Sequence, residues 1–185
     1  MSLLKVYNEE SAKPLEEHSD FESIQSTLKT AGVIFERWQA SHPISDSASQ
    51  EKILKVYSAE IERLKKERGF ITEDVISINP NVPNHRELRK KFLSEHVHSD
   101  DEARFFIDGM GLFCIHTEGK VFQIRCQKND LVNVPAYTPH WFDMGNEPYF
   151  KCIRVYTNKE GWVAEYTGSK IADIFPKFEG EWLLV

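Results

Sequence analysis

The sequence has few of the features that mark secreted, membrane-spanning or disulfide-stabilised proteins. Only three of its 185 residues are cysteines, and this odd number cannot form a complete set of disulfides within the chain. No apolar run approaches the ~20 residues that span a bilayer, and the N-terminus lacks the charged-then-apolar pattern of a signal peptide. We therefore expect a cytoplasmic protein with no membrane partner, whose Cys114, Cys126 and Cys152 are buried reduced thiols.

The sequence also lacks an excess of positive charge, internal repeats and low-complexity segments. Its net charge is −6, and its basic residues gather mainly in the range Lys52–Arg68, where glutamates alternate with them. This pattern argues against nucleic acid as the main partner. A chain of 185 residues that is 41% hydrophobic and 28% charged has the composition of an ordinary globular protein. We expect a monomer with a single domain over residues 1–185.

From Glu95 onward, short apolar segments rich in β-branched and aromatic residues are separated by turn sequences such as Asp108-Gly109, Glu118-Gly119 and Gly145-Asn146. Closely spaced antiparallel strands of this kind indicate a sandwich or a barrel. The predicted strands are Ala103–Ile107, Gly111–His116, Val121–Cys126, Leu131–Val134, His140–Met144 and Phe150–Tyr156.

The first half of the chain mixes strands with helices. Apolar residues at helical spacing predict a helix that begins near Phe21 and stops at Gly32, and a longer helix that ends at Gly69, where a left-handed cap belongs. The narrow apolar stripe of the longer helix suggests that it covers the outside of the barrel; the stripe consists of Ile53, Tyr57, Ile61 and Leu64. The remaining predictions are strands at Leu3–Tyr7, Val33–Trp38 and Phe70–Ile78, and a helix at Asn84–Leu93.

A cluster of possible metal ligands follows that last helix. His96 and His98 are two residues apart, so in an extended strand both imidazoles project from one face. Glu102 follows at the start of the next segment, and His140 lies in a similar context further along. A lone histidine is usually solvated, and a His-x-His pair alone can be accidental. For the other histidines, a solvated, capping or hairpin-end role is the default: His18, His42, His85 and His116.

Three imidazoles and a carboxylate are borderline ligands that suit iron, nickel, manganese, cobalt or zinc, and affinity alone does not choose among these ions. Four protein ligands on an octahedral ion would leave two positions for a bidentate oxygen ligand. Arg104, on the same strand face as Glu102, could hold an anionic ligand with its guanidinium fork, although a salt bridge is the plainer interpretation. An apolar wall could come from four aromatic residues, each of which could also belong to the core: Phe92, Phe105, Phe142 and Trp162.

The spacing His96-x-His98-x3-Glu102-x6-Gly109 resembles the first motif of the cupins, and Pro135, His140 and Asn146 resemble the second. The resemblance implies a mainly β fold, a cupin or jelly-roll β-barrel with a few flanking α-helices and its metal in the mouth. Under this interpretation residues 1–94 supply N-terminal strands and packing helices, residues 95–157 form the metal-binding barrel core, and residues 158–185 are a C-terminal extension.

A more specific resemblance covers most of the chain. The runs His96–Phe105, Gly109–Phe113 and Pro135–Phe142, and the earlier segment Gly32–Trp38, are similar to those of the acireductone dioxygenases of methionine salvage. The resemblance implies that His96, His98, Glu102 and His140 bind one Fe(II) or Ni(II) per chain and that Arg104 binds the anionic substrate.

The family's substrates are 1,2-dihydroxy-3-keto-5-methylthiopentene, an acireductone, and dioxygen. The resemblance implies that an iron form gives 2-keto-4-methylthiobutyrate and formate, and that a nickel form gives methylthiopropionate, formate and carbon monoxide. The reaction needs a general base, for which Asp101 and Glu95 are both candidates. The alternatives are a non-catalytic metal-binding or regulatory cupin, and a different cupin dioxygenase or isomerase.

Overall fold

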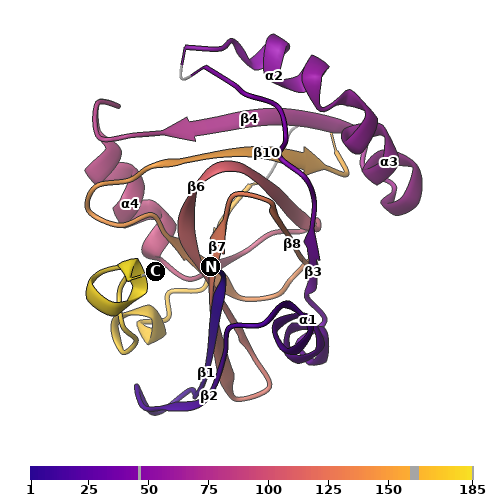
Figure 1. Cartoon of the computed structure of the whole chain (residues 1–185). Coiled ribbons are helices and arrows are strands. Elements are labelled where there is room, and N and C mark those ends of the chain that lie inside the picture. Colours follow the sequence, from indigo (N-terminus) through magenta and orange to yellow (C-terminus); the bar gives the residue numbers. More distant parts are fainter. Residues whose placement is uncertain (46, 159–162, 185) are drawn as a thin grey trace.

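Two antiparallel sheets that share one long strand form the body of the protein (Figure 1). The computed structural model describes residues 1–45, 47–158 and 163–184. The first sheet has the order β11 (Glu165–Tyr166), β5 (His96–Val97), β9 (His140–Asp143), β6 (Glu102–Thr117), β7 (Lys120–Gln127), β1 (Leu3–Asn8) and β2 (Pro14–His18). The second has the order β4 (Thr72–Ile78), β10 (Phe150–Tyr156), β6, β8 (Asp130–Val134) and β3 (Ile34–Arg37). The prediction of a mainly β barrel is confirmed.

The shared strand β6 corrects one prediction. Its first part pairs with β8 and β10, and its second part pairs with β7 and β9. The turn predicted at Asp108-Gly109 is wrong, because the chain continues as one strand of 16 residues. Gly109 adopts a φ of 68° at the change of sheet, and a Cβ there would lie 1.9 Å from the carbonyl oxygen of Tyr149. The glycine therefore serves a bend within the strand and a close approach of β10, not a hairpin.

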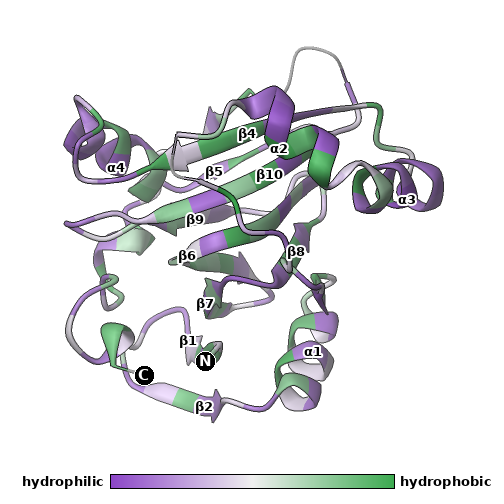
Figure 2. Ribbon diagram, turned by 45° about the horizontal axis from the view of Figure 1, so that its top comes forward, coloured by the Kyte–Doolittle hydropathy of each residue, from purple (hydrophilic) through white to green (hydrophobic). Residues whose placement is uncertain are grey.

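Helices cover the outside of the barrel as predicted. They are α1 (Phe21–Thr30), α2 (Gln50–Val56), α3 (Ser58–Arg68) and α4 (His85–Leu93). The single long helix that the apolar stripe predicts is divided at Tyr57, whose φ of −100° and ψ of 19° interrupt the helical backbone. The division lets the fully buried Tyr57 ring pack edge-on against Phe105. Figure 2 shows α3 on the outside of the molecule, with mostly hydrophilic residues.

The core has three parts. The first lies inside the barrel and is rich in phenylalanine, including Phe106, Phe113, Phe142 and Phe150. The second lies between the second sheet and α2 and α3. The third packs the two 3-10 helices Ile171–Asp173 and Gly180–Leu183 against the first sheet, with Trp141 and Trp182 at its centre. The three cysteines are buried and free, as predicted. Within the described ranges, no helix combines the length and apolar character needed to cross a bilayer.

Candidate metal centre

Three strands bring the four predicted ligands together. His96 on β5 lies opposite His140 on β9, and Glu102 begins β6, which pairs with β9 on the other side. His98 follows β5 directly. One ligand atom from each of the four residues lies within 4.8 Å of the others, and all four side chains are buried. The predicted ligand set is therefore assembled inside the barrel by strand pairing.

A backbone carbonyl orients each imidazole. The Nδ1 atom of His96 lies 2.7 Å from the oxygen of Ser94, that of His98 2.9 Å from the oxygen of Val163, and that of His140 2.7 Å from the oxygen of Thr138. A carbonyl oxygen can only accept, so each Nδ1 must carry the proton. The Nε2 atoms are left to face the centre, and this second layer of hydrogen bonds is typical of metal-binding histidines.

The charge state of the centre also suits a cation. Burial alone would raise the pKa of Glu102, but Arg104, His140 and His98 outweigh burial and hold this pKa well below its usual range. Burial and the neighbouring His140 lower the pKa of His96 to about 4. Burial opposes protonation of His98 too, but the contact of its Nε2 with Glu102 at 3.1 Å raises its pKa. A bound metal would take the place of that Nε2 proton.

The donor set fits a divalent transition ion. Three Nε2 atoms and one ionised carboxylate converge in a buried space, where His140 Nε2 lies 3.0 Å from Glu102 Oε2. An isolated buried carboxylate is costly unless cations or hydrogen-bond donors face it. A set of this kind suits iron, nickel, manganese, cobalt or zinc.

Arg104 lies beside the four ligands. Its side chain is 5% exposed, and its Nε lies 2.6 Å from Glu102 Oε1, which makes an ion pair. The guanidinium carbon also lies 5.0 Å from the ring centre of Phe142 and 5.2 Å from that of Phe113. The strand alternation that predicts Arg104 on the face of Glu102 is confirmed by this contact. An always-charged donor therefore faces the centre from an apolar wall.

The other predicted residues are divided between several places. Phe142 lies in the barrel core, and the partly buried Phe92 packs against it with 6.3 Å between ring centres. The structure does not bring Phe105 to the ligands, because it alternates with Arg104 along β6 and points to the outer cluster, where it packs on Trp38 and Tyr57. Trp162 lies outside the described residues.

Asp101 and Glu95 both carry hydrogen bonds. Asp101 accepts from the backbone N–H of Ala136 at 3.0 Å and from Asn133 at 3.3 Å. Its carboxylate thus holds the segment between β8 and β9. Glu95 accepts from Thr167 Oγ1 at 2.6 Å and lies 2.7 Å from His116 Nδ1. The structure gives each of them a structural contact next to a metal ligand.

Sequence reasoning missed the role of His116. Its two ring nitrogens lie between two carboxylates, Glu95 at 2.7 Å and Glu9 at 2.9 Å. Burial lowers the pKa of His116, but the contacts with Glu9 and Glu95 outweigh burial and raise it above its ordinary value. Glu95 and Glu9 are 21 and 107 residues from His116 in the chain. No local sequence motif therefore predicts that these three side chains meet. The imidazolium joins the turn after β1 to the strand that carries His96.

We expect His116→Gln to destabilise the protein more at about pH 6 than at about pH 9. A group with a raised folded pKa contributes stability that is fully present below its unfolded pKa, near 6.5, and lost as pH rises through the folded pKa. Urea unfolding of both proteins at the two pH values measures the difference. His18→Gln, at a more exposed pair with Glu16, is the matched control and should change little at either pH. A larger loss for His116→Gln at the alkaline pH would contradict the imidazolium assignment.

Comparison with known proteins agrees with this centre. The model of the ARD/ARD' family matches residues 4–164. Acireductone dioxygenase 2 of Pectobacterium atrosepticum and acireductone dioxygenase of Pseudomonas aeruginosa are each 52% identical to the chain over 180 residues, which are 97% of this chain and 99% of theirs. A solved structure of acireductone dioxygenase from Bacillus anthracis, with a cadmium ion in its active centre, superposes with a TM-score of 0.79 at 30% identity, covering 90% of this chain and 98% of that one. The chain is therefore an enzyme of the acireductone dioxygenase family with a three-histidine, one-glutamate metal site.

Proposed function

We propose that this enzyme cleaves the acireductone 1,2-dihydroxy-3-keto-5-methylthiopentene with dioxygen, using one Fe(II) or Ni(II) ion per chain held by His96, His98, Glu102 and His140. The observation that carries the proposal is the convergence of these four ligands with Arg104 in one buried space. The names of the relatives support the same substrate class.

The protein's own residues would bind and orient the substrate. When bound, the metal would supply a Lewis acid and a template for the enediolate. Arg104 would contact an oxygen anion of the substrate, since a guanidinium keeps its charge in an apolar site and offers a planar donor fork. Phe142, next to Arg104 and 1% exposed, would exclude water and so strengthen that contact. The three backbone carbonyls would keep the imidazoles in place through turnover.

The general base is proposed to be Asp101 or Glu95, because each directly precedes a metal ligand in the chain. Asp101→Asn and Glu95→Gln separate the two. Loss of the base removes the acidic limb of the pH profile of kcat/KM, whereas loss of a merely structural contact lowers stability and leaves the limb in place.

We expect apoprotein loaded separately with iron and with nickel to give different products from one substrate: the keto acid and formate with iron, and methylthiopropionate, formate and carbon monoxide with nickel. The same four residues would hold either ion, so the difference would come from the ion and not from the pocket. The measurement is oxygen uptake with the acireductone, followed by an assay of carbon monoxide. Protein loaded with zinc, which has no redox chemistry, is the control.

Two outcomes contradict parts of this proposal. If neither form consumes oxygen faster than the spontaneous reaction, the substrate assignment fails. If both forms give the keto acid alone, the dioxygenase activity stands and the metal-dependent branch fails.

We further propose that the enzyme works as a monomer with a single domain in the cytoplasm. Strands of residues 1–94 pair directly with strands of residues 95–157, which supports one domain. The three buried free thiols fit a reducing compartment. Light scattering of the metal-loaded protein tests the monomer, and a mass of twice the chain's 21.5 kDa would refute it.

A further inference from the structure

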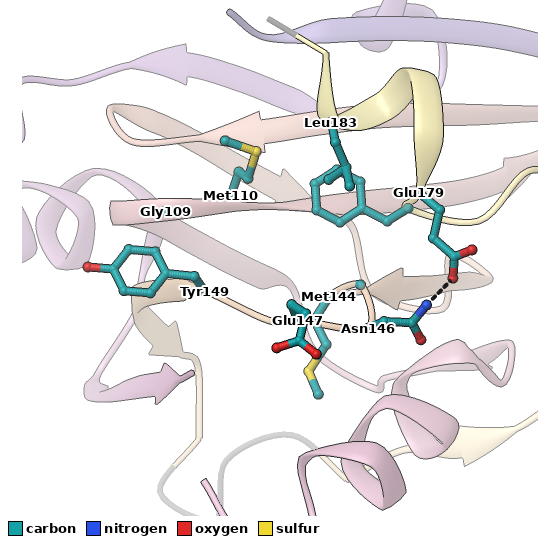
Figure 3. Close-up of a pocket in the computed structure, with 10 residues that line it drawn as sticks. Gly109, Met110, Met144, Asn146, Glu147, Tyr149, Glu179 and Leu183 are labelled. Atoms are coloured by element: carbon teal, nitrogen blue, oxygen red, sulfur yellow. Dashed lines mark hydrogen bonds between the residues drawn. The ribbon is translucent and has the colours of Figure 1, made fainter. Parts of the chain in front are cut away.

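A cavity lies between the end of β9, the bend of β6 and the C-terminal 3-10 helix (Figure 3). We call it the Met110–Met144 pocket. Its volume is about 300 Å3, at the lower end of the range of about 300–1,000 Å3 that small-molecule sites occupy. In Figure 3 Met110 and Leu183 lie on one side, Met144 and Glu147 on the other, and Tyr149 and Glu179 at the two ends. The lining residues are Gly109, Met110, Met144, Gly145, Asn146, Glu147, Tyr149, Phe178, Glu179 and Leu183.

The pocket is separate from the catalytic centre. Gly109 lies seven residues along β6 from Glu102, and Met144 lies four residues beyond His140. None of the lining residues is one of the four ligands or Arg104. Met144 is 1% exposed and belongs to the core inside the barrel, so the pocket reaches the core.

The wall of the pocket is apolar and adaptable. Met110, Met144, Phe178 and Leu183 supply thioether, aromatic and branched aliphatic surface. Methionine side chains are flexible and polarizable, so they accommodate ligands of varied shape. Leu183 is 51% exposed and Tyr149 48% exposed, which leaves a large apolar surface at the mouth open to solvent. An apolar chain of a few carbons suits this wall.

The net charge around the pocket is negative, although Arg89 donates to two lining residues, Asn146 and Glu179. Two of the ten lining residues are carboxylates, Glu147 and Glu179, and none is basic. Glu179 accepts from Asn146 Nδ2 at 2.7 Å and also contacts Arg89 at 3.1 Å. That arginine is already matched by its paired contacts with Asp143. The net charge at the mouth of the pocket is therefore negative, so the mouth repels an enediolate and attracts a cation.

We infer that the Met110–Met144 pocket binds a small organic cation, a primary ammonium group carried on an apolar chain. The ammonium lies at the mouth between Glu147 and Glu179, and the chain lies against Met110, Met144 and Leu183. The metal centre selects the opposite charge, so the two sites do not compete for one ligand. The shape of the pocket alone would also admit a neutral apolar chain. The carboxylates of Glu147 and Glu179 select the ligand that carries an ammonium group.

The three methionines of the sequence give a direct test. Protein labelled with 13C-methyl methionine shows one methyl signal each for Met1, Met110 and Met144. Titration of the metal-loaded enzyme with hexylammonium chloride should shift the signals of Met110 and Met144 saturably. Met1, 61% exposed and outside the pocket, should not move. Hexan-1-ol and sodium hexanoate, at matched ionic strength, are the neutral and anionic controls and should bind more weakly, hexanoate most weakly.

Substitution of Glu147, at the mouth of the pocket, completes the test. Glu147→Gln should weaken hexylammonium binding by up to about fivefold, as expected for an exposed ion pair, and should leave hexanol binding unchanged. Glu62→Gln, on α3 and 71% exposed, is the matched control and should change neither. Equal affinity for hexylammonium and hexanol overturns the charge selection. Absence of shifts at Met110 and Met144, or an equal shift at Met1, overturns the site.

Discussion

His98→Ala is expected to leave the purified protein without tightly bound metal. The substitution removes one of four ligands and also the hydrogen bond to the carbonyl oxygen of Val163 that orients the imidazole. Loss of an outer hydrogen bond alone typically weakens metal binding 10- to 100-fold, so loss of the ligand itself should exceed about 100-fold. Metal per chain after dialysis, by atomic emission, measures the effect.

His18→Ala is the matched control, because it removes a histidine outside the centre and should keep one equivalent of metal. Circular dichroism of His98→Ala tests that the barrel is intact. A folded His98→Ala protein that retains a full equivalent would refute His98 as a ligand.

Arg104→Ala is expected to lower kcat/KM by about 100- to 1,000-fold while the metal content stays at one equivalent. The physical reason is the loss of a preorganised charge that faces the substrate's anion, worth about 2.7–4 kcal/mol in comparable oxyanion sites. Arg104→Lys should restore activity only in part, since an ammonium lacks the planar fork. Steady-state kinetics on metal-loaded protein gives both numbers.

Arg104 also contacts Glu102, so the experiment separates two roles. If the arginine only positions the metal carboxylate, the alanine variant loses metal and activity together. If it binds the substrate, activity falls at full metal occupancy. Arg86→Ala, on the exposed side of α4, should match the parent protein in both measurements.

Much of the centre could be predicted because its rules are local. The interval from His96 to His98 needs only the alternation of a strand, and the same alternation places Arg104 beside Glu102. The same alternation places the next residue, Phe105, on the opposite face of β6, away from the metal ligands and against Trp38. Strand alternation alone therefore separates Arg104 from Phe105, although the aromatic side chain of Phe105 is also typical of a pocket wall.

What the sequence left open depends on contacts between distant segments. The carbonyl of Val163 that orients His98 is 65 residues away, and a backbone group has no sequence signature. The same holds for Glu9 beside His116. The edge strand β2 is absent from the predicted strands, because its residues are mostly exposed and carry no apolar alternation. The strand forms through its antiparallel pairing with β1. This pairing joins backbone groups and does not depend on apolar side chains in β2.

The long strand β6 also sets the order in which the molecule can form. Only its pairing with β7 is a local hairpin. Glu102 pairs with Val134, Ile115 with His140 and Ala103 with Val155, which closes loops of tens of residues. Such distant pairings are slow to form, because chain entropy is lost before contacts compensate for it. No short stretch of nascent chain can hold the four ligands together, because they converge only once β5, β9 and β6 have paired.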